Sequence, residues 1–178
     1  MYPFIRFIKA VVVARRQPPL SLLGTHVSQH LIWPWDLDPF NELNNGRTLT
    51  LFDLGRFPLG IRTGLSRTLK AMGWGLTVAG NTTRYRRRLV MFDRVEMRSR
   101  CIGWDARFFY MEQSMWKGAE CTSHILVRSA IISRTGSGIV PTEQALLALG
   151  EPVQSPPLPT WVQAWIAGDA ARVWPPQM

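Results

Sequence analysis

The segment 38–46, which reads DPFNELNNG, brings together side chains that can carry out acyl chemistry. Asp38 and Glu42 supply two carboxylates four residues apart, and three asparagines accompany them. A carboxylate can act as a general base or a nucleophile, and the unpaired N–H groups at a helix N-terminus can hold an oxyanion. The segment therefore permits acyl transfer or hydrolysis where a helix begins directly after it. The same residue types also fit a turn and a helix cap without any chemistry.

A helix is expected to follow this segment and to position it. Asn44 or Asn45 can cap a helix that opens at Gly46 or Arg47, because an Asn side chain accepts from the exposed N–H groups of a first turn. Pro58 predicts the end of this helix or a kink in it, since proline has no N–H and its ring crowds the preceding turn.

From Trp74 onward the apolar period changes from helical to two, which predicts strands. A short strand precedes the helix, and four strands follow it: 25–33, then 76–86, 89–102, 106–116 and 119–133. Large apolar side chains occupy both faces of the third of these four strands, which predicts a sheet covered on both sides. One helix followed by an antiparallel meander is an α+β architecture.

The ends of the chain differ from its body. Residues 1–19 form a predicted amphipathic arm, 20–150 a single α+β domain, and 151–178 a Pro-rich linker with a helical tail. In the arm, apolar side chains share one helical face and basic side chains the other. This pattern fits an arm that packs on its own domain or on a partner subunit, and it also fits a weak membrane-surface contact through residues 1–17.

Composition excludes several classes of protein. The chain has 178 residues, 46% hydrophobic and 19% charged, so it can build a core and is not disordered throughout. Two cysteines exclude a disulfide framework, and three scattered histidines predict no metal site. The basic residues that give the net charge of +9 are spread along the chain without a nucleic-acid motif, which predicts no nucleic-acid partner. We therefore expect a soluble, cytoplasmic protein.

The sequence of residues 38–56, DPFNELNNGRTLTLFDLGR, resembles the signature of hotdog-fold thioesterases of the 4-hydroxybenzoyl-CoA thioesterase type. In that family an Asp is followed four residues later by a His, then by Asn-Asn and the central helix. The resemblance extends over about residues 25–133 and preserves the strand–helix–meander order. It implies a hotdog fold, in which an antiparallel sheet wraps around one central helix, here with an N-terminal helical arm and a C-terminal helical tail.

The resemblance also implies roles for individual residues. Asp38 takes the place of the catalytic carboxylate, and Asn45 and Gly46 take that of the helix start, whose N–H groups polarise the thioester carbonyl. Glu42 stands where the family usually has His, so it is a second base, a charge that raises the pKa of Asp38, or the mark of a site without activity. Other branches of the fold draw the carboxylate from the central helix, which makes Asp53 a reserve candidate; the simpler interpretation is an ion pair with Arg56.

A basic run, residues 84–88, lies at the end of the first long strand. Strand alternation would direct Arg84, Arg86 and Arg88 to one side and Tyr85 and Arg87 to the other. Guanidinium groups suit the phosphates of coenzyme A, although a solvated strand end explains the run equally well.

Two tryptophans, Trp33 and Trp35, flank the turn and are candidates for lining an acyl pocket. The resemblance implies hydrolysis of an acyl-CoA or related acyl thioester by a homodimer or homotetramer, with no metal or redox cofactor. The alternative is a non-catalytic acyl-CoA or acyl-thioester binding protein, with or without association with a membrane surface. A hotdog dehydratase is less consistent with the residues around Asp38.

Overall fold

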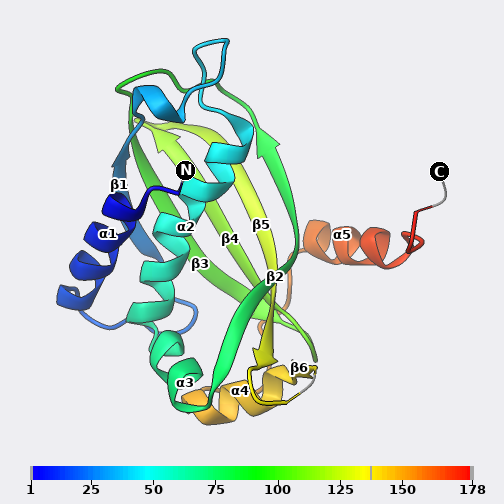
Figure 1. Cartoon of the computed structure of the whole chain (residues 1–178). Helices are drawn as coiled ribbons and strands as arrows, with labels where there is room; N and C mark the ends of the chain where they lie inside the picture. The colour runs from blue at the N-terminus through cyan, green and yellow to red at the C-terminus, as the bar shows by residue number, and fades with distance from the viewer. Residues whose placement is uncertain (1, 137, 177–178) are drawn as a thin grey trace.

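A long antiparallel sheet and one long helix dominate the computed structural model (Figure 1), which describes residues 2–136 and 138–176. The strands are β1 His26–Leu31, β2 Trp74–Tyr85, β3 Arg94–Trp104, β4 Phe109–Lys117, β5 Glu120–Ser133 and β6 Ile139–Val140. The helices are α1 Phe4–Arg16, α2 Asn45–Arg62, α3 Leu65–Ala71, α4 Thr142–Leu149 and α5 Thr160–Ala170, with a short 3-10 turn at Pro34–Asp36. The first residue of the predicted arm and the last two of the predicted tail lie outside the described residues.

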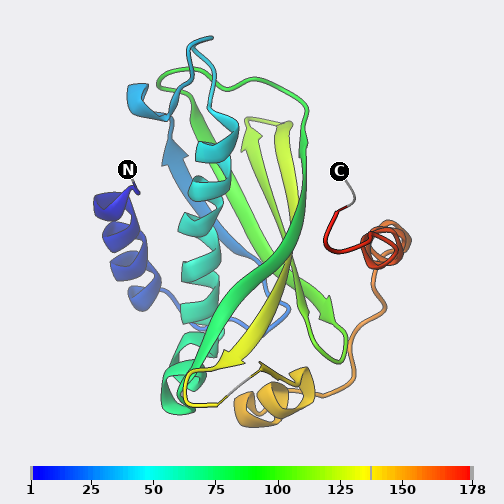
Figure 2. The same ribbon diagram turned by 45° about the vertical axis from the view of Figure 1, so that its right-hand side comes forward.

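The sheet wraps around α2, which confirms the predicted hotdog fold. Its strands lie in the order β1-β3-β4-β5-β2, all neighbours are antiparallel, and β6 pairs with β5. In Figure 2 the sheet curves behind α2, and β2 crosses beside the lower part of this helix. Strand β2 closes the sheet on one side and β1 on the other. The predicted meander is present for β3, β4 and β5, but β2 pairs with β5 and not with β3, so the four strands after the helix do not all follow one another in the sheet.

The predicted strands are present with shifted ends. The largest shift is in β3, which begins at Arg94 and not at residue 89. A tight turn occupies the intervening residues: Phe92 has a positive φ of 65°, and the carboxylate of Asp93 accepts a hydrogen bond from the N–H of Val90 at 3.0 Å. An Asp side chain that bonds its own turn competes with a strand, which is why the strand starts after it.

Helix α2 passes through Pro58 and continues to Arg62, so of the two predicted outcomes, an end or a kink, the end at Pro58 is wrong. Pro58 is buried, and packing holds the helix together despite one lost backbone hydrogen bond. The helix buries one face in a core with residues from β3, β4 and β5. Gly55 allows the closest approach to the sheet, because a Cβ there would lie 2.4 Å from Ser99 Oγ and 2.6 Å from Met97 Sδ.

The outer face of the sheet is only half covered, which corrects the prediction of a sheet buried on both sides. Helix α5 packs its Val162 over Tyr110 and Leu126 at one end of this face. The other end carries charged side chains, with Arg100 bound to Glu112 and the imidazole of His124 2.9 Å from the same carboxylate.

Helix α1 packs alongside α2 in both views (Figures 1 and 2). Ala14 is buried and Phe7 packs against the core and edge-on against Phe57. The predicted apolar face is turned outward instead, with Ile5 86% and Ile8 60% exposed. Of the helices in the described part of the chain, none combines the length and apolarity that a membrane crossing requires.

Candidate functional site

The turn that carries Asp38 is closed on itself by hydrogen bonds. Asp38 Oδ1 accepts from the N–H groups of Phe40 at 2.9 Å and Glu42 at 3.2 Å, and the N–H of Asp38 donates to the carbonyl of Glu42 at 2.8 Å. Asn41 adopts a positive φ of 58°, which Asn tolerates better than most residues. These bonds use Oδ1 of Asp38, so this carboxylate oxygen fixes the turn.

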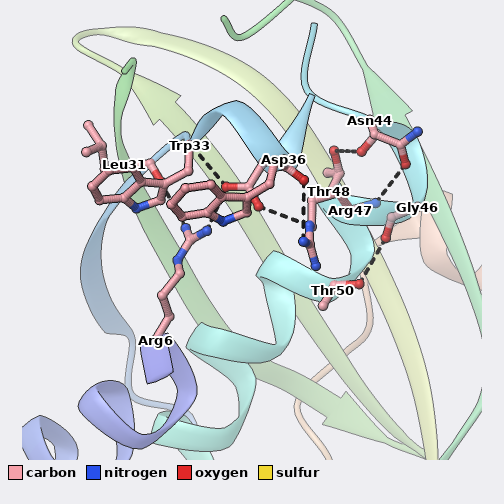
Figure 3. A network of polar contacts seen from close by, with 10 residues as sticks. Arg6, Leu31, Trp33, Asp36, Asn44, Gly46, Arg47, Thr48 and Thr50 are labelled. Carbon is pink, nitrogen blue, oxygen red and sulfur yellow. Dashed lines mark hydrogen bonds and ion pairs between the residues drawn. The ribbon is translucent and has the colours of Figure 1, made fainter. Parts of the chain in front are cut away.

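A buried carboxylate two residues earlier ties this turn to two helices. Asp36 is fully buried, and its Oδ2 lies 2.7 Å from Arg6 Nη1 of α1 and accepts from the N–H of Trp33 at 3.0 Å. Its Oδ1 lies 2.9 Å from Arg47 Nε of α2 (Figure 3). The two guanidinium groups balance the buried charge, so Asp36 is a structural anchor of the site. Sequence reasoning did not single it out.

The start of α2 follows the predicted capping. Asn44 is the N-cap, and its Oδ1 accepts from the N–H of Arg47 at 3.1 Å (Figure 3). Thr48 donates its hydroxyl back to the carbonyl of Asn44 at 3.1 Å. Asn45 and Gly46 are the first two residues of the helix, where N–H groups have no partner inside the helix and the helix dipole is positive. This end can stabilise an oxyanion.

A cavity of about 200 Å³ lies against this helix start. It is lined by Glu42 and Asn45 on one side and by Tyr85 and Arg88 on the other. Arg88 Nη1 donates to Glu42 Oε1 at 3.3 Å, and the Tyr85 hydroxyl donates to the carbonyl of Asn45 at 3.4 Å. Ser123, on β5, also lines the cavity, and its hydroxyl is buried without a hydrogen-bond partner. No signal in the sequence distinguishes Ser123 from the other serines. Asp38 does not line this cavity; it is bonded to Glu42, which does.

The arginine run does not alternate as predicted, because β2 ends at Tyr85. Arg84 is still on the strand, opposite His124 of β5, so it shares the outer face of the sheet with that histidine and points away from the cavity. Arg86 and Arg88 both line the cavity. Of the three predicted phosphate-binding arginines, the fold thus brings two to the helix start.

The two tryptophans stack on each other, and neither lines the cavity at the helix start. The ring centroids of Trp33 and Trp35 are 5.0 Å apart with an interplanar angle of 4°, and Phe92 meets Trp33 edge-on. Trp35 remains 63% exposed.

The reserve carboxylate, Asp53, pairs with Arg56 as the simpler interpretation predicts. Arg56 Nη1 also donates to Gln113 Oε1 at 2.8 Å, and the Tyr2 hydroxyl bonds Asp53. Burial raises the pKa of Asp53, opposed by the Arg56 charge, and burial also raises the pKa of Tyr2 to about 12. Asp53 lies on α2 some distance from the helix start and lines a different cavity. Within residues 2–136 and 138–176 there is no group of three or more His, Cys, Asp or Glu side chains that could hold a metal ion.

Comparison of the sequence with known families and proteins gives consistent matches. Residues 32–166 match the model of a family described as the thioesterase-like superfamily. Protein THEM6 of Xenopus laevis is 33% identical over 166 residues, which cover 92% of this chain and 78% of that protein. Protein THEM6 of Drosophila melanogaster is 26% identical over 165 residues, which cover 92% of this chain and 83% of that protein. The family match extends past the predicted domain into α5.

Solved structures share the fold at low sequence identity. The probable thioesterase YbaW from Escherichia coli superposes with a TM-score of 0.66 at 17% identity, over 72% of this chain and 98% of that one. The hypothetical protein SAV2348 from Staphylococcus aureus, solved in complex with CoA, gives a TM-score of 0.64 at 12% identity, over 80% of this chain and 94% of that one.

Proposed function

Because the chain belongs to the thioesterase-like superfamily, we propose that it hydrolyses an acyl-CoA or a related acyl thioester to a free acid and a thiol. One observation carries this proposal: Asp38 and Glu42 are joined by backbone bonds in a turn beside the N-terminus of α2, and a cavity opens there. Thioester hydrolysis needs a base and a group that binds the oxyanion. Here the turn that carries the base leads directly into the helix end that can bind the oxyanion.

In the proposed mechanism Asp38 takes a proton from water as the water oxygen attacks the thioester carbonyl. The N–H groups of Asn45 and Gly46 donate to the carbonyl oxygen as it becomes negative. The carbon–sulfur bond then breaks, and the proton passes to the leaving thiolate. Direct attack by the Asp38 carboxylate, with an anhydride that water then cleaves, is the covalent version of the same scheme.

Arg86 and Arg88 are the proposed contacts for the phosphates of coenzyme A. Both line the cavity at the helix start, and Arg88 is 74% exposed, so its pair with Glu42 costs little to open. A guanidinium binds phosphate oxygens in a fork. The SAV2348 protein, which shares the fold, was solved in complex with CoA, and this supports CoA as the thiol.

We further propose that the protein works as a homodimer. Within the described residues β2 pairs with β5 and with no other strand, which leaves a long open edge. Leu76 and Val78 on this edge are 39% and 49% exposed, and Phe57 on the adjacent face of α2 is 48% exposed. An open apolar edge of this length is a template for pairing with another strand. A second copy of the chain would cover it and enclose the site.

The test is release of thiol from acyl-CoAs of short, long and aromatic acyl groups, with Asp38→Asn and Glu42→Gln beside the wild type. Asn keeps an acceptor oxygen for the two turn N–H groups, so Asp38→Asn removes the base without opening the turn. We expect a loss of 100-fold or more, of the order that removing a general base produces. Glu143→Gln, on the exposed side of α4, is the matched control and leaves the rate unchanged.

Binding of acyl-CoA measured beside thiol release distinguishes a hydrolase from a binding protein. Glu42 replaces the His of related sequences and is held by Arg88, which keeps the alternative of an acyl-thioester binding protein open. Binding of acyl-CoA without thiol release from any substrate would replace the proposed hydrolase with that binding protein.

A further inference from the structure

A second cavity, of about 590 Å³, lies between α2, α3 and the beginning of β2. Figure 2 shows β2 crossing beside the lower part of α2. Apolar side chains make up most of its wall, among them Leu22, Leu59, Leu65, Leu69, Trp74 and Met111. A cavity of this size and lining suits an apolar ligand and not the phosphates assigned to the first cavity.

One face of α2 runs from the first cavity to the second. Asn45, Leu49, Asp53, Arg56 and Gly60 succeed one another at intervals of three or four residues, so they lie along one face of the helix. Asn45 lines the first cavity, and the last three line the second. Leu49, between them, is 36% exposed. A ligand that begins at the helix start can therefore lie along this face and end in the second cavity.

The distance along this face of α2 predicts the length of acyl chain that would reach the second cavity. At ~1.5 Å per residue, Asp53 lies roughly 12 Å along the axis from Asn45, and Gly60 roughly 22 Å. An extended chain advances about 1.2 Å per bond, as the reach of ~3.5 Å over the three backbone bonds of a residue shows. An acyl chain with its carbonyl at the helix start thus needs about 10 carbons to enter the second cavity and about 18 to fill it.

One polar group in the cavity wall has no partner. Ser129, on β5, lines the cavity and is 0% exposed, and its hydroxyl makes no hydrogen bond. A buried hydroxyl without a partner is unfavourable, and a ligand oxygen that displaces the atoms now covering it would satisfy it. A plain hydrocarbon chain would leave it unsatisfied.

We propose that the second cavity binds the far part of a long acyl chain, and that Ser129 favours chains with a hydroxyl or keto oxygen there. This inference rests on the proposed hydrolase function and deepens it by naming the acyl class. The thioester lies at the N-terminus of α2, the chain follows the face of this helix that carries Leu49 and Asp53, and its oxygenated end reaches Ser129.

Gly60→Leu tests the location. Gly60 lines the cavity, and a Cβ there meets only Ser66 Oγ at 3.2 Å, at the end of a flexible side chain. The added side chain fills space that the ligand would occupy, and we expect at least a 10-fold loss of kcat/KM with hexadecanoyl-CoA and little change with butanoyl-CoA. Gly168→Leu is the matched control, a helical glycine of α5 with no atom within 4 Å of its Cβ. Unchanged activity of Gly60→Leu on both substrates would overturn the location.

Ser129→Ala tests the selection. We expect the wild type to prefer 16-hydroxyhexadecanoyl-CoA to hexadecanoyl-CoA by about 5-fold or more, as one satisfied hydrogen bond allows. In Ser129→Ala this ratio falls toward one while the rate with the plain chain is kept. Equal rates for the two substrates in the wild type, or an equal effect of the variant on both, would overturn the role of Ser129.

A binding measurement separates this inference from the hydrolase proposal. Titration of the full chain with a fluorescent C18 fatty acid, followed by displacement with hexadecanoate and butanoate, requires no catalysis. Saturable binding that hexadecanoate displaces and that Gly60→Leu abolishes supports the cavity assignment even where no thiol is released. Thiol release from short acyl-CoAs without fatty-acid binding would keep the hydrolase and overturn the long-chain site.

Discussion

Arg47 Nε lies 2.9 Å from Oδ1 of Asp36, and this contact joins the first turn of the central helix to the loop that carries the candidate base. Asp36 also holds Arg6 of α1 at 2.7 Å, so one buried carboxylate fixes three elements. Asn44 adds a backbone bond, since its N–H donates to the carbonyl of Asp36 at 3.0 Å. The position of Asp38 relative to the helix start therefore depends on a residue that does no chemistry in the proposed mechanism.

Asp36→Asn is expected to destabilise the protein strongly. The substitution removes the charge that balances two guanidinium groups, which are only 17% and 15% exposed in Arg6 and Arg47. Breaking such a buried network costs about 3–5 kcal/mol. Urea unfolding measures the change. Arg6→Met removes one of the two cations and leaves the other, so a loss as large as that of Asp36→Asn would contradict a shared network.

Two glycines of α2 are expected to respond in opposite ways to alanine. Gly55→Ala places a methyl group 2.4 Å from Ser99 Oγ and destabilises the fold by about 1–3 kcal/mol through overpacking. Gly60→Ala meets only a flexible hydroxyl at 3.2 Å and gains up to about 1 kcal/mol from helix propensity. Thermal unfolding of both variants measures the difference. A stabilised Gly55→Ala would mean that α2 does not press against β3 at this point.

The sequence predicted those elements whose signals are local. The Asn44 cap and the change of apolar period at Trp74 are sufficient to place α2 and the strands that follow it, but not the pairing of β2 with β5. Pro58 does not end the helix because tertiary packing overrides a local helix breaker: the residue is buried, and buried residues before and after it hold the helix. The outward turn of α1 was also not predictable, because Arg6 is drawn to Asp36 thirty positions away.

The candidate site was predicted where its residues depend on local signals and missed where they depend on packing. Glu42, Asn45, Arg86 and Arg88 meet at one cavity, since the turn, the cap and the end of β2 converge there. Arg84 lies on β2 and Arg86 lies just after its end, so the residue at which β2 ends decides which of these arginines reaches the cavity. Ser129 carries no sequence signal at all, because an unpaired hydroxyl is a property of the packed wall around it.

Stability is expected to fall between about pH 6.5 and pH 4 because of two histidines. Burial lowers the pKa of His26 and that of His30 from 6.5 to about 4, aided by the charges of Arg62 and Arg6. In this window the unfolded chain binds protons that the folded chain does not, so stability is complete above the window and is lost as the pH falls through it.

Thermal unfolding against pH measures this loss. His26→Asn keeps an acceptor for Arg62, whose Nη1 lies 3.0 Å from the Nδ1 of His26, and it should flatten the decline. The pKa of Glu112 is lowered from 4.5 to about 2 by its hydrogen bond with His124, so its own contribution is lost only below about pH 4.5 and meets the window only at its acid end. An unchanged slope in His26→Asn would contradict a neutral, buried His26.

Val78→Lys is expected to separate the proposed dimer. Val78 lies on the open edge of β2 and is 49% exposed, and a charge on an edge strand is a common means of preventing strand pairing. Light scattering should show a dimeric wild type and a monomeric variant. Val27→Lys, on the opposite edge strand β1 at 42% exposure, is the matched control and leaves the mass unchanged.

Because the proposed dimer encloses the site, monomers of Val78→Lys should also lose thiol release. A monomeric wild type with full activity would contradict the dimer, and the single chain would then hold the whole site.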